Sequence, residues 1–353
     1  MVNLMVKRKR TISQNFTVRP RRHLVWVLPV LSLLTFILSW AAVYPSRAVE
    51  GWYARRFFPV ISGLAGRVAD AVAFSWLDAA VPLGIALLVL LVRVRRWGWM
   101  LNVVAGVYLF FFWSWGLNYH RLPLASKLQM DPAQTKPEAM EQFARHAAAE
   151  LNRLYVDKRQ PGYDENHTRE EAAARVRQVV RVIDGSDWEA ARRIKISWIA
   201  NPWLHAAGID GVFNPIGHEP VISNTVLDIE RPFIIAHELA HVRGYPDEGD
   251  ANLVAVFATL MSNDPAFQYS GWLNLWLYVR TRELDKLLES GPQNDLQRMF
   301  DRARAEEIRW ISDVQRIMLD WFLKANNVGQ GIRSYSKVAI LAAGSEPYWD
   351  RYR

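Results

Sequence analysis

The sequence predicts a mainly α-helical protein in which three N-terminal transmembrane helices precede a mostly helical domain with a small β element. Residues 24–44 and 97–119 are stretches of 21 and 23 residues without a formal charge, and such lengths span a bilayer. Residues 71–92 are also apolar enough to cross, although they include Asp78. From residue 131 onward the composition is that of a soluble domain with helical periodicity.

Positive charge is concentrated in the N-terminal third of the chain. The whole chain has a net charge of +8, and residues 1–122 hold 15 Lys and Arg against 3 Asp and Glu. Basic residues precede the first apolar stretch and recur at 93–96, between the second and third. Because basic loops stay in the cytoplasm, three spans that begin inside end outside. We therefore predict a basic cytoplasmic tail (1–23), a membrane domain (24–122) and an extracytoplasmic domain (123–353).

The composition also indicates which partners to expect. Residues 51–70 mix aromatic and basic residues with a glycine-interrupted apolar stretch, which is typical of an interfacial segment. The lipid bilayer is therefore an expected partner. A nucleic acid is not expected, because residues 123–353 are slightly acidic. The absence of cysteine excludes disulfides, a cysteine nucleophile and cysteine metal ligands. The sequence carries no signal for an oligomeric state.

One stretch contains a pattern with chemical meaning, the H-E-x-x-H of His237, Glu238 and His241. Pro232 suits the first turn of a helix and Gly244 the position just past its end. Residues four apart share one helical face, so both imidazoles can bind a single Zn²⁺. Glu238 faces elsewhere and is predicted to be the general base that deprotonates a zinc-bound water. The alternative is a helix whose histidines have structural partners.

A catalytic zinc site needs a third protein ligand, and three acidic candidates follow the motif. They are Asp247, Glu248 and Asp250. Two of them also have a structural interpretation, in which Asp247 is the N-cap of a helix at 250–261 and Asp250 completes a capping box. Our order of preference is Asp250, then Glu248, then Asp247, and it depends on the resemblance described below.

Further segments of the C-terminal part have two interpretations each. Residues 194–200 alternate as a strand and residues 211–223 form an extended segment, which a peptide substrate could join by strand addition or which could be a plain loop. His218 and Glu219 in this segment either help to bind substrate or form an exposed pair. Tyr269 or Tyr278 either stabilises an oxyanion or packs in the core. Helices are expected at 137–155, 169–183, 263–290 and 296–326.

Several short motifs together resemble a bacterial membrane-protein family of unknown function, whose members are similar to zincin-type zinc metallopeptidases. The motifs are Trp115-Gly116-Leu117-Asn118-Tyr119-His120-Arg121, the H-E-x-x-H helix, Asp250-Ala251-Asn252, Asp264-Pro265 with Tyr269-Ser270-Gly271, and Gly331-Ile332-Arg333-Ser334-Tyr335. The resemblance implies a zincin-like domain in which zinc is held by His237, His241 and the residue at position 250. The family has Glu there, so Asp250 is a departure by one methylene.

These observations predict a zinc-dependent metallopeptidase that is anchored in the bacterial inner membrane as a multi-pass protein. It is expected to hydrolyse a peptide or protein substrate on the extracytoplasmic side. One alternative is a non-catalytic envelope protein in which the metal stabilises a scaffold or a peptide-binding cleft. A second alternative is a transporter or channel component. The absence of an acid deep in the first or third apolar stretch argues against it.

Overall fold

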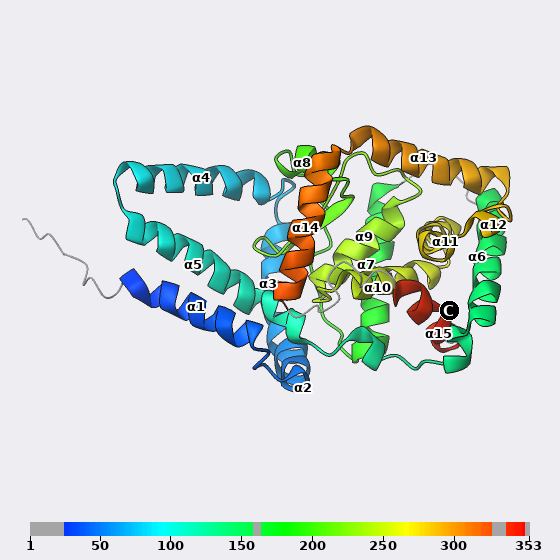
Figure 1. Ribbon diagram of the computed structural model, residues 1–353, viewed down its shortest axis with the longest axis horizontal. Coiled ribbons are helices and arrows are strands. Elements are labelled where there is room, and N and C mark those ends of the chain that lie inside the picture. Colours follow the sequence, from blue (N-terminus) through cyan, green and yellow to red (C-terminus); the bar gives the residue numbers. More distant parts are fainter. Residues whose placement is uncertain (1–24, 158–163, 327–336, 350–353) are drawn as a thin grey trace, which may run out of the picture.

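The computed structural model describes residues 25–157, 164–326 and 337–349, and within them the chain is mainly helical with one small sheet (Figure 1). The predicted tail at 1–23 and the motif at 331–335 lie outside these residues. Apart from three short 3-10 helices, the elements of the described chain are α1 (Val27–Trp40), α2 (Ser46–Ala48), a π-helix (Val49–Phe57), α3 (Phe58–Asp70), α4 (Leu77–Arg93), α5 (Trp97–Ser114), α6 (Pro137–Asp157), α7 (Glu165–Asp184), α8 (Ala200–Ala207), β1 (Gly211–Asn214), β2 (Glu219–Ile222), α9 (Arg231–Val242), α10 (Glu248–Leu260), α11 (Pro265–Val279), α12 (Arg282–Asp285), α13 (Ser290–Glu306), α14 (Arg309–Ala325) and α15 (Val338–Trp349).

Helices α1, α4 and α5 extend together from one side of a larger helical body (Figure 1). Helix α5 packs against both α1 and α4. The start of α1 and the turn between α4 and α5 lie at the end far from the body, whereas the other ends of these helices join it (Figure 1). Most large side chains on their outer surfaces are apolar and exposed. We call these three helices the hairpin layer.

The lengths of the helices in the hairpin layer do not agree with the prediction of three transmembrane helices, which was wrong in number. In the part of the chain that the structure describes, α5 alone is long and apolar enough to cross a membrane. Helix α1 has 14 residues, or about 21 Å at about 1.5 Å per residue, against a hydrocarbon core of about 30 Å. Helix α4 begins only at Leu77, because Ser75 and Trp76 turn away to bond the Glu219 carboxylate at 2.8 and 3.1 Å.

The body is arranged around α9, which contacts α7, α10, α11 and both strands. Its apolar residues face all sides and are buried, as expected of a helix at the centre of a core. The same core includes Phe58, Phe112 and Trp115, which lie on the N-terminal side of the predicted domain boundary at 122. The body and the base of the hairpin layer therefore share one continuous core.

The small sheet lies against α9. Strands β1 and β2 form an antiparallel hairpin in which Gly211 faces Ile222, and Lys195 forms a parallel bridge to Val221 on the other side of β2. The strand predicted at 194–200 is thus reduced to one bridge, because the chain enters α8 at Ala200. Among the described residues, the outer edge of β1 has no strand beside it.

The two long helices predicted at 263–290 and 296–326 are four shorter ones, α11 to α14. Helix α11 ends at Val279, where Arg280 and Thr281 adopt extended conformations. Helix α13 ends where Glu307 and Ile308 do the same. The hydrophobic pattern continues across both breaks, so it gave no sign of them.

Candidate metal centre

Helix α9 supplies the two histidines. Pro232 lies in its first turn and Gly244, with φ +80°, follows its last turn, both as the sequence predicts. A Cβ on Gly244 would also lie 2.8 Å from the Phe58 ring and 2.9 Å from Asn118. The Nε2 atoms of His237 and His241 lie 3.1 Å apart on the same face of the helix.

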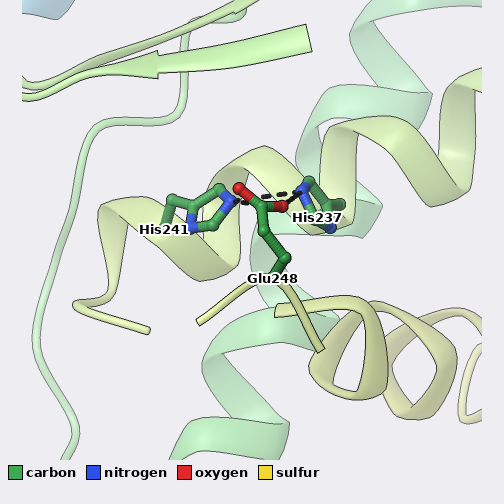
Figure 2. Close-up of side chains that lie close together, drawn as sticks. All are labelled: His237, His241 and Glu248. Carbon is green, nitrogen blue, oxygen red and sulfur yellow. Dashed lines mark hydrogen bonds and ion pairs between the residues drawn. The ribbon is translucent and has the colours of Figure 1, made fainter. Parts of the chain in front are cut away.

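Helix α10 supplies the third side chain. Its N-cap is Asp247, whose carboxylate accepts a hydrogen bond from the Asp250 amide at 3.0 Å. Glu248 is therefore the first helical residue, and its side chain points back at α9 (Figure 2). Its Oε2 lies 3.3 Å from His237 Nε2 and 3.6 Å from His241 Nε2.

These three atoms have the spacing that a zinc ion requires. Tetrahedral Zn²⁺ with bonds of about 2.0–2.1 Å holds its ligand atoms about 3.3–3.4 Å apart. The three separations here are 3.1, 3.3 and 3.6 Å. The side chains are 13, 8 and 19% exposed for His237, His241 and Glu248, so the group is sheltered without being sealed. Solvent therefore reaches part of the group.

The ring of His241 is oriented by the backbone. Its Nδ1 lies 2.7 Å from the carbonyl oxygen of Tyr245, which can only accept, so Nδ1 keeps its proton and Nε2 is the atom that offers a lone pair to a metal once the ring is neutral. The carbonyl of His241 in turn accepts a hydrogen bond from the indole of Trp115 at 3.0 Å. Within the described chain, Nδ1 of His237 has no hydrogen-bond partner.

The charges of the group are strongly coupled in the absence of a metal. Burial alone would lower the pKa of His241, but the Glu248 carboxylate raises it to about 9. Burial opposes ionisation of Glu248, yet His241 and His237 hold the pKa of its carboxyl well below the usual range. Glu248 is therefore an anion at neutral pH. A divalent cation would replace the proton that it now shares with the histidines.

Glu238 lies beside the group without joining it. Burial raises the pKa of its carboxyl to about 7, and its Oε2 has no hydrogen-bond partner in the described part of the chain. Strand β1 approaches closely, since a Cβ on Gly211 would lie 2.5 Å from Glu238 Oε1. A buried carboxylate with a pKa near neutrality has the properties of a general base. Gly211 was not identified from the sequence, because this contact is between distant segments.

The other two acidic candidates are directed elsewhere. The Oδ2 of Asp250 accepts a hydrogen bond from the Leu124 amide at 3.1 Å, and burial raises its pKa to about 7. Asp247 caps α10, as the alternative interpretation of the sequence proposed. The structure thus brings together His237, His241 and Glu248, and it places Asp250 and Asp247 outside that group.

Two tyrosines lie within electrostatic reach of Glu248. Burial and the Glu248 carboxylate raise the pKa of Tyr278, one of the two tyrosines singled out from the sequence. Burial, Glu248 and Asp247 likewise raise the pKa of Tyr119. From the sequence, Tyr119 was only part of the motif at 115–121 and had no predicted role. Tyr269, the other candidate, donates its hydroxyl proton to Asp295 at 2.8 Å and is part of the core.

A buried ionic network supports the turn that follows α9. Arg121 and Lys127 each bond both Glu50 and Asp184, at 2.7–3.0 Å. Arg121 also donates to the Gly244 carbonyl at 2.8 Å, and the Tyr245 hydroxyl donates to Asp184 at 2.6 Å. Burial opposes the charge on Asp184, yet Arg121 and Lys127 lower the pKa of its carboxyl to about 2. The network fixes the carbonyl that orients His241.

His218 and Glu219 are fully buried, which corrects the prediction of an exposed or substrate-binding pair. Glu219 forms an ion pair with Lys195 at 3.1 Å, and both side chains are inaccessible to solvent. Its carboxylate also accepts from Ser75, Trp76 and Asn214. These contacts connect β2 to the start of α4 and serve the fold.

Comparison with known proteins adds a family. A family model described as protein of unknown function (DUF3810) matches residues 53–342. The chain belongs to this family. The match includes α9 and α10, so the candidate metal centre of this DUF3810 protein lies inside the matched range. No curated protein and no solved structure matches the chain.

Proposed function

We propose that this DUF3810 protein is a membrane-anchored zinc-dependent metallopeptidase with a zincin-like body. The observation that carries the proposal is the triangle of His237, His241 and Glu248, whose donor atoms have zinc spacing. Bound zinc would acidify a water and polarise a peptide carbonyl. Glu238, buried beside the triangle, would accept the proton of that water and pass it to the leaving amine.

The geometry favours Glu248 over Asp250 as the third ligand. The two residues are two positions apart on α10, which is about 200° around a helix. They therefore face opposite ways, Glu248 toward the histidines and Asp250 toward Leu124. The position at which the family resemblance has Glu is thus occupied here by an Asp with a different partner. Glu248 would replace it as ligand.

The open edge of β1 supports a peptide as substrate. A substrate segment in extended conformation can add to such an edge through backbone hydrogen bonds, whatever its side chains. Gly211, at the start of this strand, adjoins Glu238. A peptide bound there would lie next to the proposed base.

The exposed apolar surface of the hairpin layer supports the membrane anchor. The start of α1 and the turn containing Arg95 and Arg96 lie at the same end of this layer, opposite the body (Figure 1). Since basic turns remain in the cytoplasm, the body would lie on the extracytoplasmic side of the bacterial inner membrane.

The proposal is tested on the full chain purified in detergent. Metal analysis should find about one zinc per chain, and Glu248→Gln should lose it, whereas Asp250→Asn and Asp247→Asn should keep it. Glu238→Gln should keep zinc and lose cleavage of a mixed peptide library followed by mass spectrometry. Glu138→Gln, an exposed change on α6, is the matched control. Protein without metal from a zinc-replete preparation would refute the site.

The same variants separate the peptidase from the non-catalytic alternative. If wild-type protein binds zinc and cleaves no peptide in the library, and a Glu238→Gln strain behaves as wild type while a deletion strain does not, the metal serves a scaffold. If the Glu238→Gln strain shows the same loss of function as the deletion strain, the result supports the peptidase.

A further inference from the structure

Helix α14 carries an exposed apolar stripe. Trp310, Val314, Ile317, Met318 and Trp321 recur at helical spacing, and each is between 47 and 70% exposed. The opposite side of the helix packs on the body through Ser312 and Leu323, which are buried. A soluble surface helix shows charge on its outer face, so a stripe of five large apolar residues there is unusual.

Helix α14 lies next to the base of the hairpin layer. Phe322 on α14 packs against Phe111 near the end of α5 and against Tyr119 just beyond it, with ring centroids 6.2 and 5.8 Å apart. Figure 1 shows α14 crossing in front of the junction between the hairpin layer and the body, transverse to α4 and α5. A helix in this position runs along the surface of a bilayer that contains α5.

A second group of exposed aromatic residues lies near the start of α4 and the start of α14. Trp198 is 86% exposed, and Trp203 on α8 is also exposed. The residues around Trp198 are fixed to the first turn of α4, because the Asp78 carboxylate accepts from the Ser197 hydroxyl at 2.7 Å and from the Ile199 amide at 3.0 Å. Helix α8 is joined to the start of α14 by a hydrogen bond from the Ile308 amide to the Ala206 carbonyl at 2.9 Å.

Both clusters are thus connected to the ends of α4 and α5 that join the body. Tryptophan is enriched where hydrocarbon meets headgroups, because its ring is apolar and its N–H needs a polar partner. An amphipathic helix at that level buries its apolar face about 5–10 Å deep. Because α14 packs against the end of α5, its exposed stripe adjoins the apolar hairpin layer, and this favours a bilayer as the occupant.

We propose that α14 is an interfacial helix whose stripe, together with Trp198 and Trp203, is immersed in the headgroup region of the bilayer that holds the hairpin layer. This inference rests on the membrane anchor of the proposed function and is independent of zinc. It fixes the rotation of the body relative to the membrane. The metal centre, whose helix bonds Trp115 at the end of α5, then lies close to the membrane surface.

The cysteine-free chain permits a direct test by single labels. The full chain carries one cysteine, labelled with an environment-sensitive fluorophore, in vesicles of phosphatidylcholine and phosphatidylglycerol. Ile317→Cys and Val314→Cys probe the stripe, and Val104→Cys on α5 probes the membrane anchor. Arg145→Cys, exposed on α6 at the far end of the body, is the control (Figure 1). Quenching is measured with spin-labelled lipid and with iodide.

The expected result is strong lipid quenching at positions 104, 314 and 317 and iodide quenching at position 145. Lipid quenching at 104 together with iodide quenching at 314 and 317 would overturn the interfacial helix and leave the anchor intact. Iodide quenching at all four positions would overturn the anchor as well. A blue-shifted label at 317 that neither reagent quenches would indicate that another copy of the chain covers the stripe, which also overturns the proposal.

Discussion

Substitution of Gly211 tests how Glu238 is positioned. In Gly211→Ala, the new Cβ would lie 2.5 Å from Glu238 Oε1 and 2.9 Å from its Cδ and Cγ. Ordinary van der Waals contact is at about 3.5 Å, so the carboxylate must retreat by about 1 Å. A displacement of about 1 Å in a reacting group costs about 100-fold in rate. We expect that loss in peptide hydrolysis, with about 1–3 kcal/mol of destabilisation from overpacking.

Zinc content should remain unchanged in Gly211→Ala, because the clash involves Glu238 and none of the three proposed ligands. The assay compares turnover and bound zinc in the full-length variant with those of Gly106→Ala, where a new Cβ meets nothing within 4 Å. Wild-type turnover in Gly211→Ala would show that Glu238 needs no such placement. Loss of zinc together with turnover would also contradict the reasoning, because it would mean a wider collapse.

Zinc affinity should rise about tenfold per pH unit between about pH 7 and 9 and level off above, because metal-free His241 has a pKa of about 9 and must lose its proton to bind. Calorimetry in buffers of different ionisation enthalpy should count about one proton released at pH 7; no release would refute this. Arg121→Met should cost about 3–5 kcal/mol in urea unfolding, since it leaves buried carboxylates uncompensated, whereas Arg145→Met, at an exposed pair, should cost under about 0.5 kcal/mol. Equal effects would exclude a structural role for the network. Tyr278→Phe should lower kcat about 10²–10³-fold with zinc retained if its hydroxyl stabilises an oxyanion, while Tyr269→Phe, whose hydroxyl bonds Asp295, should leave kcat unchanged.

Helix α9, which carries the two histidines, could be predicted from local sequence because its signals are local. Pro232, Gly244 and the spacing of the histidines determine the limits of α9 and the face that carries both rings. The mainly helical class and the small sheet were predicted for the same reason and are confirmed. The cap at Asp247 was among the interpretations, since N-caps depend on neighbouring residues alone.

The remaining features depend on contacts between distant segments. Which of Glu248 and Asp250 faces the histidines is decided by how α10 is rotated against α9, and sequence order does not encode that rotation. The length of α4 could not be predicted either, because its start is set by hydrogen bonds to Glu219, more than a hundred residues away. Likewise, the burial of Glu219 follows from its pairing with Lys195.

In the proposed membrane-anchored zinc peptidase, the hydrogen bond from the Trp115 indole to the His241 carbonyl would couple the position of α5 in the bilayer to the metal ligand His241. A change in membrane thickness tilts or shifts a transmembrane helix at a cost of fractions of a kcal/mol per Å. Such a shift of α5 would pull on the turn whose Tyr245 carbonyl holds the imidazole in place. Lipid chain length would therefore be an experimental variable for the proposed centre. A fragment that begins after Trp115 would lack the indole that bonds the His241 carbonyl.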